Sequence, residues 1–170
     1  MDTDELKHAI ADESKRIEED SLHSMKGHFN SGSLWGKVNL ILGLPSAILA
    51  GWASIEAFSE KPHLTAILAL FSAALTSTIV FLKPQTISNN HKNAGREYNK
   101  LKNTARRFRE IELSGLEVEE AKKLINDLAN QRDALNSMSP DIPRWAYEKA
   151  KKDIDEGRAE YKVDVKKDLL

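Results

Sequence analysis

The chain has 170 residues, 30% of them charged, with a net charge of −1 and a mean hydropathy of −0.48. This length fits one domain, or a small membrane protein with one soluble part. Because the chain contains no cysteine, disulfide bonds, thiol catalysis and cysteine-based zinc sites are excluded. The averages hide a contrast, since residues 38–82 have charged residues only within a short elbow at 56–63, whereas both flanks are densely charged.

Residues 1–34 are predicted to form a cytoplasmic segment with an amphipathic helix from residue 3 to about residue 29. Its thin apolar stripe consists of Leu6, Ile10, Ile17, Leu22, Met25 and Phe29. The stripe favours packing against other helices over lying on lipid, because a helix on a lipid surface usually has a basic polar face. Residues 30–33, Asn-Ser-Gly-Ser, predict a break or flexible joint. Trp35 and Lys37 are typical anchors where a membrane span meets water.

Residues 35–83 are predicted to form a transmembrane hairpin, with spans at about 38–58 and 63–82. Each run is close to the ~20 residues that a helix needs to cross the hydrocarbon core of a bilayer. No charge opposes insertion near either centre, where one charged residue would cost about 2.5–3.5 kcal/mol. The alternative is a buried helical hairpin in a soluble protein. Such a helix is usually amphipathic, and the rest of this chain has little apolar sequence to cover two helices that are apolar all round.

The short elbow forces the two spans antiparallel, so both termini are expected on one side of the membrane. Residues 83–109 hold eight basic residues against the single acidic Glu97, which makes that side the cytoplasm by the positive-inside rule. The basic residues expected to face lipid headgroups are Lys83, Lys92, Arg96, Lys100 and Lys102. Nucleic acid is not an expected partner, because Tyr98 and Phe108 fall on an apolar seam and not among the basic residues.

The spans carry two further patterns. The first span has two rows of small residues that would let helix backbones approach closely in lipid: Gly43, Ala47 and Gly51, and beside them Ser46, Ala50 and Ser54. Chance is the alternative, since small residues are common in spans. In the second span, the hydroxyls of Thr65, Ser72 and Thr76 share one helix face and are candidates to line a pore. Their alternative role is to bond carbonyls of their own helix. Pro45 is expected to kink the first span near Ile41.

Residues 84–161 are predicted to form a cytoplasmic module of three helices, which the N-terminal helix joins. The first, residues 88–112, has a heptad-like seam of Ala94, Tyr98, Leu101, Ala105 and Phe108. Residues 114–117 have the form of a capping box and predict a turn before the second helix. That helix carries Ala121, Leu124, Leu128, Leu135 and Met138, and pairs with the first as an antiparallel hairpin. Residues 139–143 break it, and a third helix at 145–161 turns Ala146, Ala150 and Ile154 inward. Residues 162–170 are expected to be a frayed, charged tail.

The sequence therefore predicts an all-α membrane protein without strands. It contains no motif of a hydrolase, a phosphate-binding loop or a dinucleotide-binding fold, so we expect it not to be an enzyme. The histidines at 8, 23, 28, 63 and 91 have no spacing that places two on one helix face as metal ligands. We expect no metal, cofactor or catalytic residue.

The order of features resembles the SLATT family, two-transmembrane effector domains found beside nucleotide-generating and nucleotide-sensing proteins in bacterial conflict systems. The resemblance covers about residues 10 to 160. It is carried by His28-Phe29 followed by Trp35, by Leu-Gly-Leu-Pro at 42–45, by Ala-Gly-Arg-Glu-Tyr-Asn-Lys-Leu at 94–101, by Arg-Arg-Phe at 106–108 and by Ser-Pro-Asp-Ile-Pro at 139–143.

The resemblance implies a homo-oligomer that forms a pore in the inner membrane when a partner signals infection, causing growth arrest or cell death in anti-phage defence. The chain has no recognisable fused nucleotide-binding domain, so the trigger stays open between a separate nucleotide-generating or sensor protein, a nucleotide bound by the helical tail, and an unrelated protein. Two other functions remain alternatives: a non-conducting membrane scaffold that recruits a cytoplasmic partner, and a soluble helical adaptor.

Overall fold

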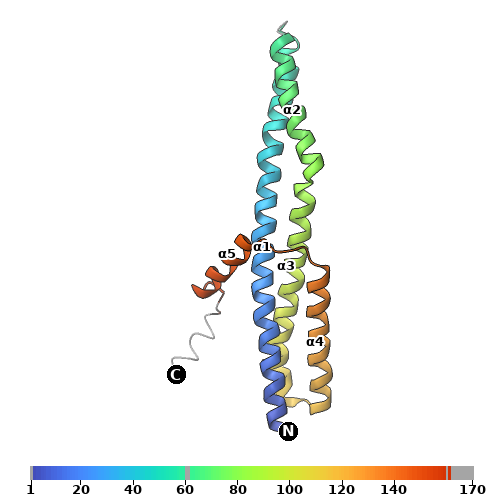
Figure 1. Cartoon of the computed structure of the whole chain (residues 1–170), viewed down its shortest axis with the longest axis vertical. Coiled ribbons are helices and arrows are strands. Elements are labelled where there is room, and N and C mark those ends of the chain that lie inside the picture. The colour runs from blue at the N-terminus through green and yellow to red at the C-terminus, as the bar shows by residue number, and fades with distance from the viewer. Residues whose placement is uncertain (1, 60–61, 160, 162–170) are drawn as a thin grey trace. The chain divides into compact units, whose positions relative to one another are not determined.

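A computed structural model describes residues 2–59, 62–159 and 161 (Figure 1). Their regular structure is entirely helical, as predicted. The helices are α1 (Thr3–Glu56), α2 (Pro62–Leu82), α3 (Pro84–Arg107), α4 (Val118–Met138) and α5 (Arg144–Asp155). A π-helical turn, η1 (Phe108–Glu112), and a 3-10 turn, η2 (Leu113–Gly115), connect α3 to α4. The tail predicted at 162–170 lies outside the described residues.

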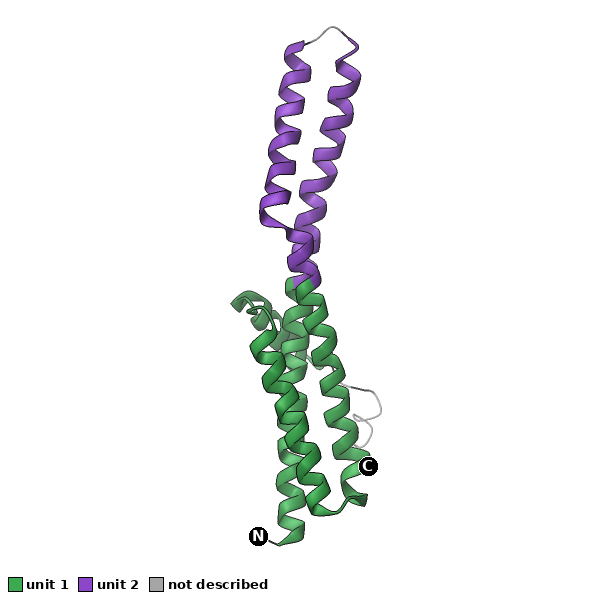
Figure 2. Ribbon diagram, turned by 90° about the vertical axis from the view of Figure 1, so that its right-hand side faces the viewer, with its two compact units in different colours: residues 1–31, 90–170 green, residues 32–89 purple. Residues whose placement is uncertain are grey.

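The chain divides into two compact units (Figure 2). Unit 1 contains residues 1–31 and 90–170, and unit 2 contains residues 32–89. Helices α1 and α3 each contribute residues to both units. Unit 2 includes the whole segment 35–83 that was predicted as a membrane hairpin, and in it α1 and α2 lie side by side and run in opposite directions (Figure 1).

Unit 1 has a core of large apolar side chains from α1, α3, α4 and the turns between α3 and α4. Its buried members are Ile10, Ile17, Leu101, Ala105, Phe108, Leu113, Ala121, Ile125 and Leu128. The seam predicted for the helix at 88–112 is confirmed, because all five of its residues are between 0% and 8% exposed, although α3 ends at Arg107 and the last seam residue, Phe108, lies in η1. On α4, Ala121 and Leu128 are buried as predicted, but Met138 is 75% exposed and Ile125 takes an inward position that the prediction left out.

The break predicted at residues 30–33 is wrong, since α1 continues through them without interruption. Tertiary hydrogen bonds hold these turn-forming residues in the helix. In unit 1, the Asn30 side-chain amide donates to the carbonyl of Ala146 at 3.2 Å. In unit 2, the Ser88 hydroxyl donates to the carbonyl of Gly32 at 2.7 Å. Local turn propensity is weak beside packing of this kind.

The predicted stripe on α1 is only partly correct. Ile10 and Ile17 are buried, whereas Phe29 is 37% exposed. The buried face continues through polar residues at heptad spacing: Ser14, Ser21, His28 and Ser31, each at most 1% exposed. The Ser14 hydroxyl donates to the carbonyl of Ala105 at 2.8 Å, so a small polar side chain brings α1 and α3 close together.

Several predicted helix boundaries differ. The capping box is wrong, because Ser114 belongs to the 3-10 turn and Glu117 is the N-cap of α4, without a side-chain capping hydrogen bond. The third helix of the module ends at Asp155 and not near residue 161; Ala146 and Ala150 are buried in it and Ile154 is half-buried.

Helix α3 begins at Pro84, earlier than the predicted residue 88. It can do so because Lys83 adopts a left-handed backbone conformation, with φ of 48°, and ends α2 immediately before the proline. A side chain in that conformation costs about 1–2 kcal/mol. The joint between α2 and α3 is therefore a single strained residue.

Candidate functional site: the paired helices of unit 2

The contact between α1 and α2 in unit 2 is made by small side chains. Ser46 and Ala53 on α1, and Leu68 and Ser72 on α2, are each less than 9% exposed. Only Leu68 among these four is a large apolar residue. The two helices can therefore approach closely, but they bury little apolar surface against each other.

Hydroxyl groups bridge the two helices at the middle of this contact. The Ser46 hydroxyl donates to the carbonyl of Ser72 at 3.0 Å, and the Ser72 hydroxyl donates to the carbonyl of Ser46 at 2.9 Å. The Thr76 and Ser46 hydroxyl oxygens are 2.7 Å apart, which lets Thr76 donate to Ser46. We call Ser46, Ser72 and Thr76 the hydroxyl cluster. Ser72 and Thr76, both predicted to line a pore, thus lie within hydrogen-bonding distance of Ser46 on α1 in this chain.

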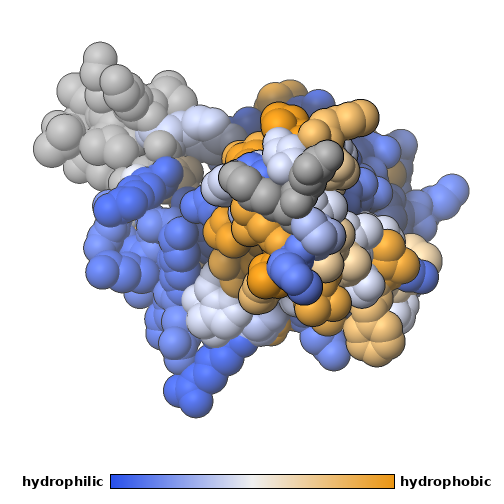
Figure 3. Space-filling view, turned by 90° about the horizontal axis from the view of Figure 1, so that it is seen from above, coloured by the Kyte–Doolittle hydropathy of each residue, from blue (hydrophilic) through white to orange (hydrophobic). Residues whose placement is uncertain are grey.

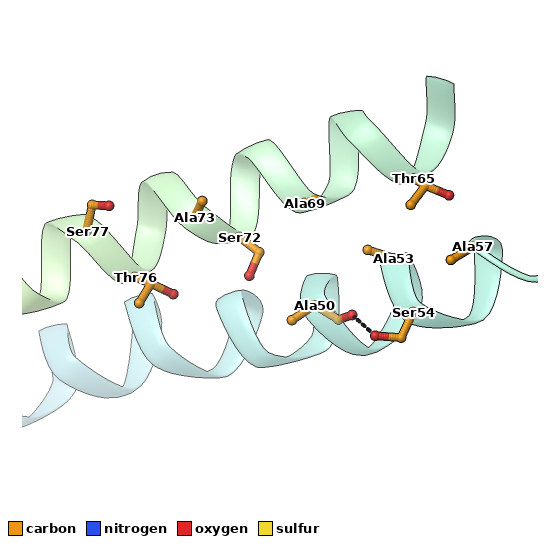
Figure 4. A pocket seen from close by; sticks show the side chains of 10 residues that line it. All are labelled: Ala50, Ala53, Ser54, Ala57, Thr65, Ala69, Ser72, Ala73, Thr76 and Ser77. Carbon is orange, nitrogen blue, oxygen red and sulfur yellow. Dashed lines mark hydrogen bonds between the residues drawn. The ribbon is translucent and has the colours of Figure 1, made fainter. Parts of the chain in front are cut away.

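A groove of about 590 Å³ lies along the same contact (Figure 4). It is lined only by alanine, serine and threonine: Ala50, Ala53, Ser54, Ala57, Thr65, Ala69, Ser72, Ala73, Thr76 and Ser77. Thr65, Ser72 and Thr76 all point from α2 towards α1 (Figure 4). The structure therefore brings the three predicted pore-lining residues to one groove, although their role in conduction stays a prediction.

The two predicted rows of small residues on α1 have different surroundings. In one row, Ser46 is buried and Ala50 and Ser54 line the groove. In the other, Gly43 is half-buried, while Ala47 and Gly51 are exposed. A Cβ atom added at Gly51 would meet no atom within 4 Å. That second row faces away from α2 at these positions, so its predicted role in packing needs a helix other than α2.

Large apolar side chains cover the outside of unit 2. Those on α1 that are at least 50% exposed are Leu40, Ile41, Leu44, Ile48, Trp52 and Ile55; on α2 they are Ile67, Leu70, Phe71, Val80 and Phe81. We call these residues the apolar belt. Hydrophobic residues gather over the joined ends of α1 and α2 in Figure 3. Only 11% of the most apolar 18-residue stretch of each helix is buried, so neither apolar stretch lies in a core of the described chain.

The predicted lipid-facing basic residues are not equivalent. Lys83, Arg96 and Lys100 are exposed and Lys92 is half-buried. Lys102 departs from the prediction, because it is only 7% exposed and its Nζ donates to the hydroxyl of Tyr161 at 3.3 Å within unit 1.

Unit 1 contains a second polar cluster, which we call the histidine pair. His28 on α1 and His91 on α3 are 1% and 3% exposed, and their Nδ1 atoms are 3.0 Å apart. Tyr98 stacks on His28 with ring centroids 5.4 Å apart and donates its hydroxyl to Asn136 Oδ1 at 2.7 Å. Burial, followed by repulsion from His91, lowers the pKa of His28 to about 4, and burial lowers the pKa of His91.

Sequence reasoning missed this pair because it searched for two histidines on one helix. The available signal was the heptad: His28 follows Ser21 by seven residues, and His91 precedes Ala94 of the α3 seam by three. Among the described residues there is no group of three or more histidines, cysteines or carboxylates that could hold a metal ion.

No protein-family model matches the chain, and neither a curated protein nor a solved structure is significantly similar to it.

Proposed function

We propose that this protein is a membrane effector that oligomerises and forms a pore in the bacterial inner membrane when a partner triggers it. One observation carries the membrane part of the proposal: unit 2 exposes the large apolar side chains of the belt, while the residues buried between its helices are the small Ser46, Ala53 and Ser72, with Leu68 as the one large apolar member among them. This distribution is inverted relative to a water-soluble helical hairpin. It fits a lipid solvent, in which small residues and hydrogen bonds drive helix association.

The energetics of insertion support the same interpretation. A Leu, Ile, Phe or Val near the centre of a span contributes about −0.3 to −0.6 kcal/mol, and the apolar belt supplies such residues on both helices. In lipid the bridging hydroxyls also have no water to bond. Their reciprocal hydrogen bonds to backbone carbonyls satisfy both helices at once.

Charge gives the orientation that we propose. Lys37 precedes the apolar part of α1, and Lys83 follows α2 at the start of a basic stretch. Basic residues close to span ends are retained in the cytoplasm, which would place both termini there. Exposed Arg96 and Lys100 would then add attraction to anionic lipid headgroups.

Opening would require the hydroxyl cluster to exchange partners. In the arrangement described here, Ser46 holds Ser72 and Thr76 against α1. We propose that this is the closed form and that α2 rotates in the open oligomer, so that Thr65, Ser72 and Thr76 face a shared water-filled path. The strained Lys83 joint would transmit movements of α3 to α2.

The biological role follows from the resemblance to SLATT effectors. The trigger would be a separate nucleotide-generating or sensor protein, and the outcome would be growth arrest or death of an infected cell. The homo-oligomer would use the exposed row of Ala47 and Gly51, which has room for another helix.

Dye release from liposomes containing the purified protein tests pore formation. The double variant Ser72→Ala/Thr76→Val removes two cluster hydroxyls with little change in side-chain volume, so it should insert normally. Loss of their bonds to α1 favours opening and a less polar lining hinders passage, so the rate of dye release should differ from that of wild type. The control is Thr78→Val, which removes an exposed hydroxyl that lies outside the groove and bonds the carbonyl of Ala74 in its own helix. If the double variant and this control release dye equally fast, the hydroxyl row has no part in the mechanism.

A non-conducting membrane scaffold is the second candidate, and one observation favours it. The hydroxyls of Ser46 and Ser72 are satisfied between α1 and α2, so a stable hairpin needs no pore. A scaffold would insert and recruit a cytoplasmic partner without releasing dye under any trigger, and its effect on cells would persist when unit 2 is replaced by an unrelated two-span hairpin.

A further inference from the structure

The histidine pair is a buried contact between two titratable side chains, one on α1 and one on α3, in unit 1. Two neutral imidazoles can share one hydrogen bond through their Nδ1 atoms, which are 3.0 Å apart, if one ring carries the Nδ1 proton and the other offers its lone pair. Each ring must then have a defined tautomer. The contact therefore depends on the protonation state of both histidines.

Added protons weaken this contact in two steps. The first creates a charged imidazolium in a site where His28 and His91 are 1% and 3% exposed, so the charge loses its hydration. The second proton occupies the Nδ1 lone pair that accepted the hydrogen bond, and it places two cations in contact. The neutral pair thus favours packing of α1 on α3, and protonation opposes it.

In the part of the chain that the structure describes, the groups that contact the pair and Tyr98 carry no negative charge. On α3, the titratable neighbour is the neutral Tyr98, whose pKa is raised by burial. Helix α4 contributes the amide of Asn136, and the connection after it contributes the hydroxyl of Ser139 beside Tyr98 and the apolar Ile142 beside Gly27. On the other side of α1, His23 stacks on Tyr147 of α5. Among the described residues, the titratable group whose charge would act on His28 is the other histidine of the pair, His91.

We propose that the histidine pair is a proton-sensitive contact that holds α1 and α3 together at neutral pH and releases them at acidic pH. The inference concerns the packing of unit 1 and does not depend on conduction by unit 2. Both helices continue from the pair into unit 2, α1 beyond residue 31 and α3 before residue 90, so the release acts on the two chain segments that lead to the apolar helices.

The direction of the pH effect follows from linkage. A histidine has an ordinary pKa of about 6.5 in an opened or unfolded segment, and the packed His28 has a lower value. Below pH 6.5 the opened form binds protons that the packed form rejects, so opening is favoured by up to about tenfold per pH unit for each such histidine. Above pH 6.5 the contact is at full strength.

Hydrogen–deuterium exchange of the full chain in lipid nanodiscs tests this, because exchange reports rare opening even when the packed form dominates. Protection factors, corrected for the intrinsic pH dependence of exchange, are compared at about pH 7.5 and about pH 5 for residues 25–31 and 88–94. A fall of about 30-fold is expected from one histidine over that range. Amides beside the Ser14–Ala105 contact, at the other end of the α1–α3 packing, should lose less protection.

Two variants sharpen the test. In His28→Asn/His91→Asn, side-chain amides keep a hydrogen bond near the Nδ1 positions but do not titrate, so protection should be the same at both pH values. His8→Asn removes an exposed histidine from α1 and should keep the full pH effect. The proposal is overturned if wild-type protection near the pair changes less than about threefold, or if the double asparagine variant retains the fall. If that variant does not fold, the wild-type result alone decides.

Discussion

The interiors of unit 1 and unit 2 differ in the size and polarity of the side chains that they bury, although both units consist of packed helices. Unit 1 buries Leu101 and Phe108 at 2% exposure, as a water-soluble bundle does. Unit 2 buries Ser46 and Ser72 and leaves Leu70 69% exposed. Water drives the first arrangement, because burying apolar surface is favourable there. The second has no such driving force within the chain, so its stability must come from close backbone approach, hydrogen bonds and whatever surrounds the belt.

Serine shows the difference most directly. In unit 1, Ser14 sits between large apolar neighbours and bonds the carbonyl of Ala105. In unit 2, the bonds of Ser46 and Ser72 make up the centre of the interface itself. Serine therefore accompanies large apolar side chains in the interior of unit 1, whereas in unit 2 it makes the central contact between the two helices.

Phe108→Ala should have the largest effect, because it opens a cavity in the core of unit 1. Such truncations cost about 3–5 kcal/mol. Chemical denaturation of the full protein, followed by the helical signal of unit 1, measures the loss. Phe81→Ala is the matched control in unit 2, where the ring is 86% exposed, and it should change unit 1 by less than about 0.5 kcal/mol. Equal losses of stability for Phe108→Ala and Phe81→Ala would contradict the contrast between the two units.

Leu70→Arg tests whether lipid surrounds the apolar belt. A charge at the middle of a span costs about 2.5–3.5 kcal/mol of insertion free energy, so the fraction of protein recovered in alkali-washed membranes should fall. The control Met138→Arg changes a side chain of unit 1 that is 75% exposed and should leave this fraction unchanged. If Leu70→Arg inserts as well as wild type, the belt does not face lipid.

Gly95→Ala should destabilise unit 1 by about 1–3 kcal/mol through overpacking. Its added Cβ would lie 3.0 Å from Cδ1 and Cε1 of Phe29. Gly115→Ala, which meets nothing within 4 Å, is the control in unit 1. Gly51→Ala in unit 2 also meets nothing within the chain, so an effect of that variant on oligomer size, measured by crosslinking in membranes, would reveal packing between copies.

The free energy of unfolding of unit 1 should depend on pH through His28. Its pKa of about 4 in the folded chain lies below the unfolded value of 6.5, so stability is complete above pH 6.5 and decreases as the pH falls towards 4. At about pH 5.5 the loss is about 1.4 kcal/mol. Denaturation of wild type and His28→Asn at several pH values measures it, and parallel curves for the two proteins would contradict the assignment.

Ser72→Ala should have the smallest effect, a loss of about 0.6 kcal/mol from the α1–α2 contact, since hydrogen bonds between helices in lipid are weak on average. Titration with SDS in mixed micelles measures the stability of unit 2. Thr78→Val, which removes a hydroxyl that bonds its own helix, is the control. A loss of several kcal/mol at Ser72 would make hydrogen bonding, and not close packing, the main stabilising force of unit 2.

Much of the fold was predictable from periodicity. The α3 seam and the inward alanines of α5 are buried as the spacing predicts, because a heptad pattern places those residues on one helix face in any packed arrangement. The break at 30–33 and the capping box failed for a common reason. Both rest on local propensities, which tertiary contacts such as the bond from Asn30 to Ala146 outweigh.

The candidate site was predictable only in part. The alignment of Thr65, Ser72 and Thr76 follows from their spacing on one helix, and the structure gathers them in one groove. Their partner Ser46 was assigned to a packing row, but its hydrogen bonds to Ser72 depend on the register between α1 and α2, which no pattern within either helix specifies.

The sequence by itself determined the helical content, the two uncharged runs of membrane-spanning length and the basic stretch beside them, because these depend on composition and on the period of one helix. The tertiary structure alone decided which polar residues meet across helices: Ser46 with Ser72, Lys102 with Tyr161, and His28 with His91. These contacts depend on the register and rotation of one helix relative to another. Register and rotation are set when many side chains pack together, and the order of residues along the chain predicts them only weakly.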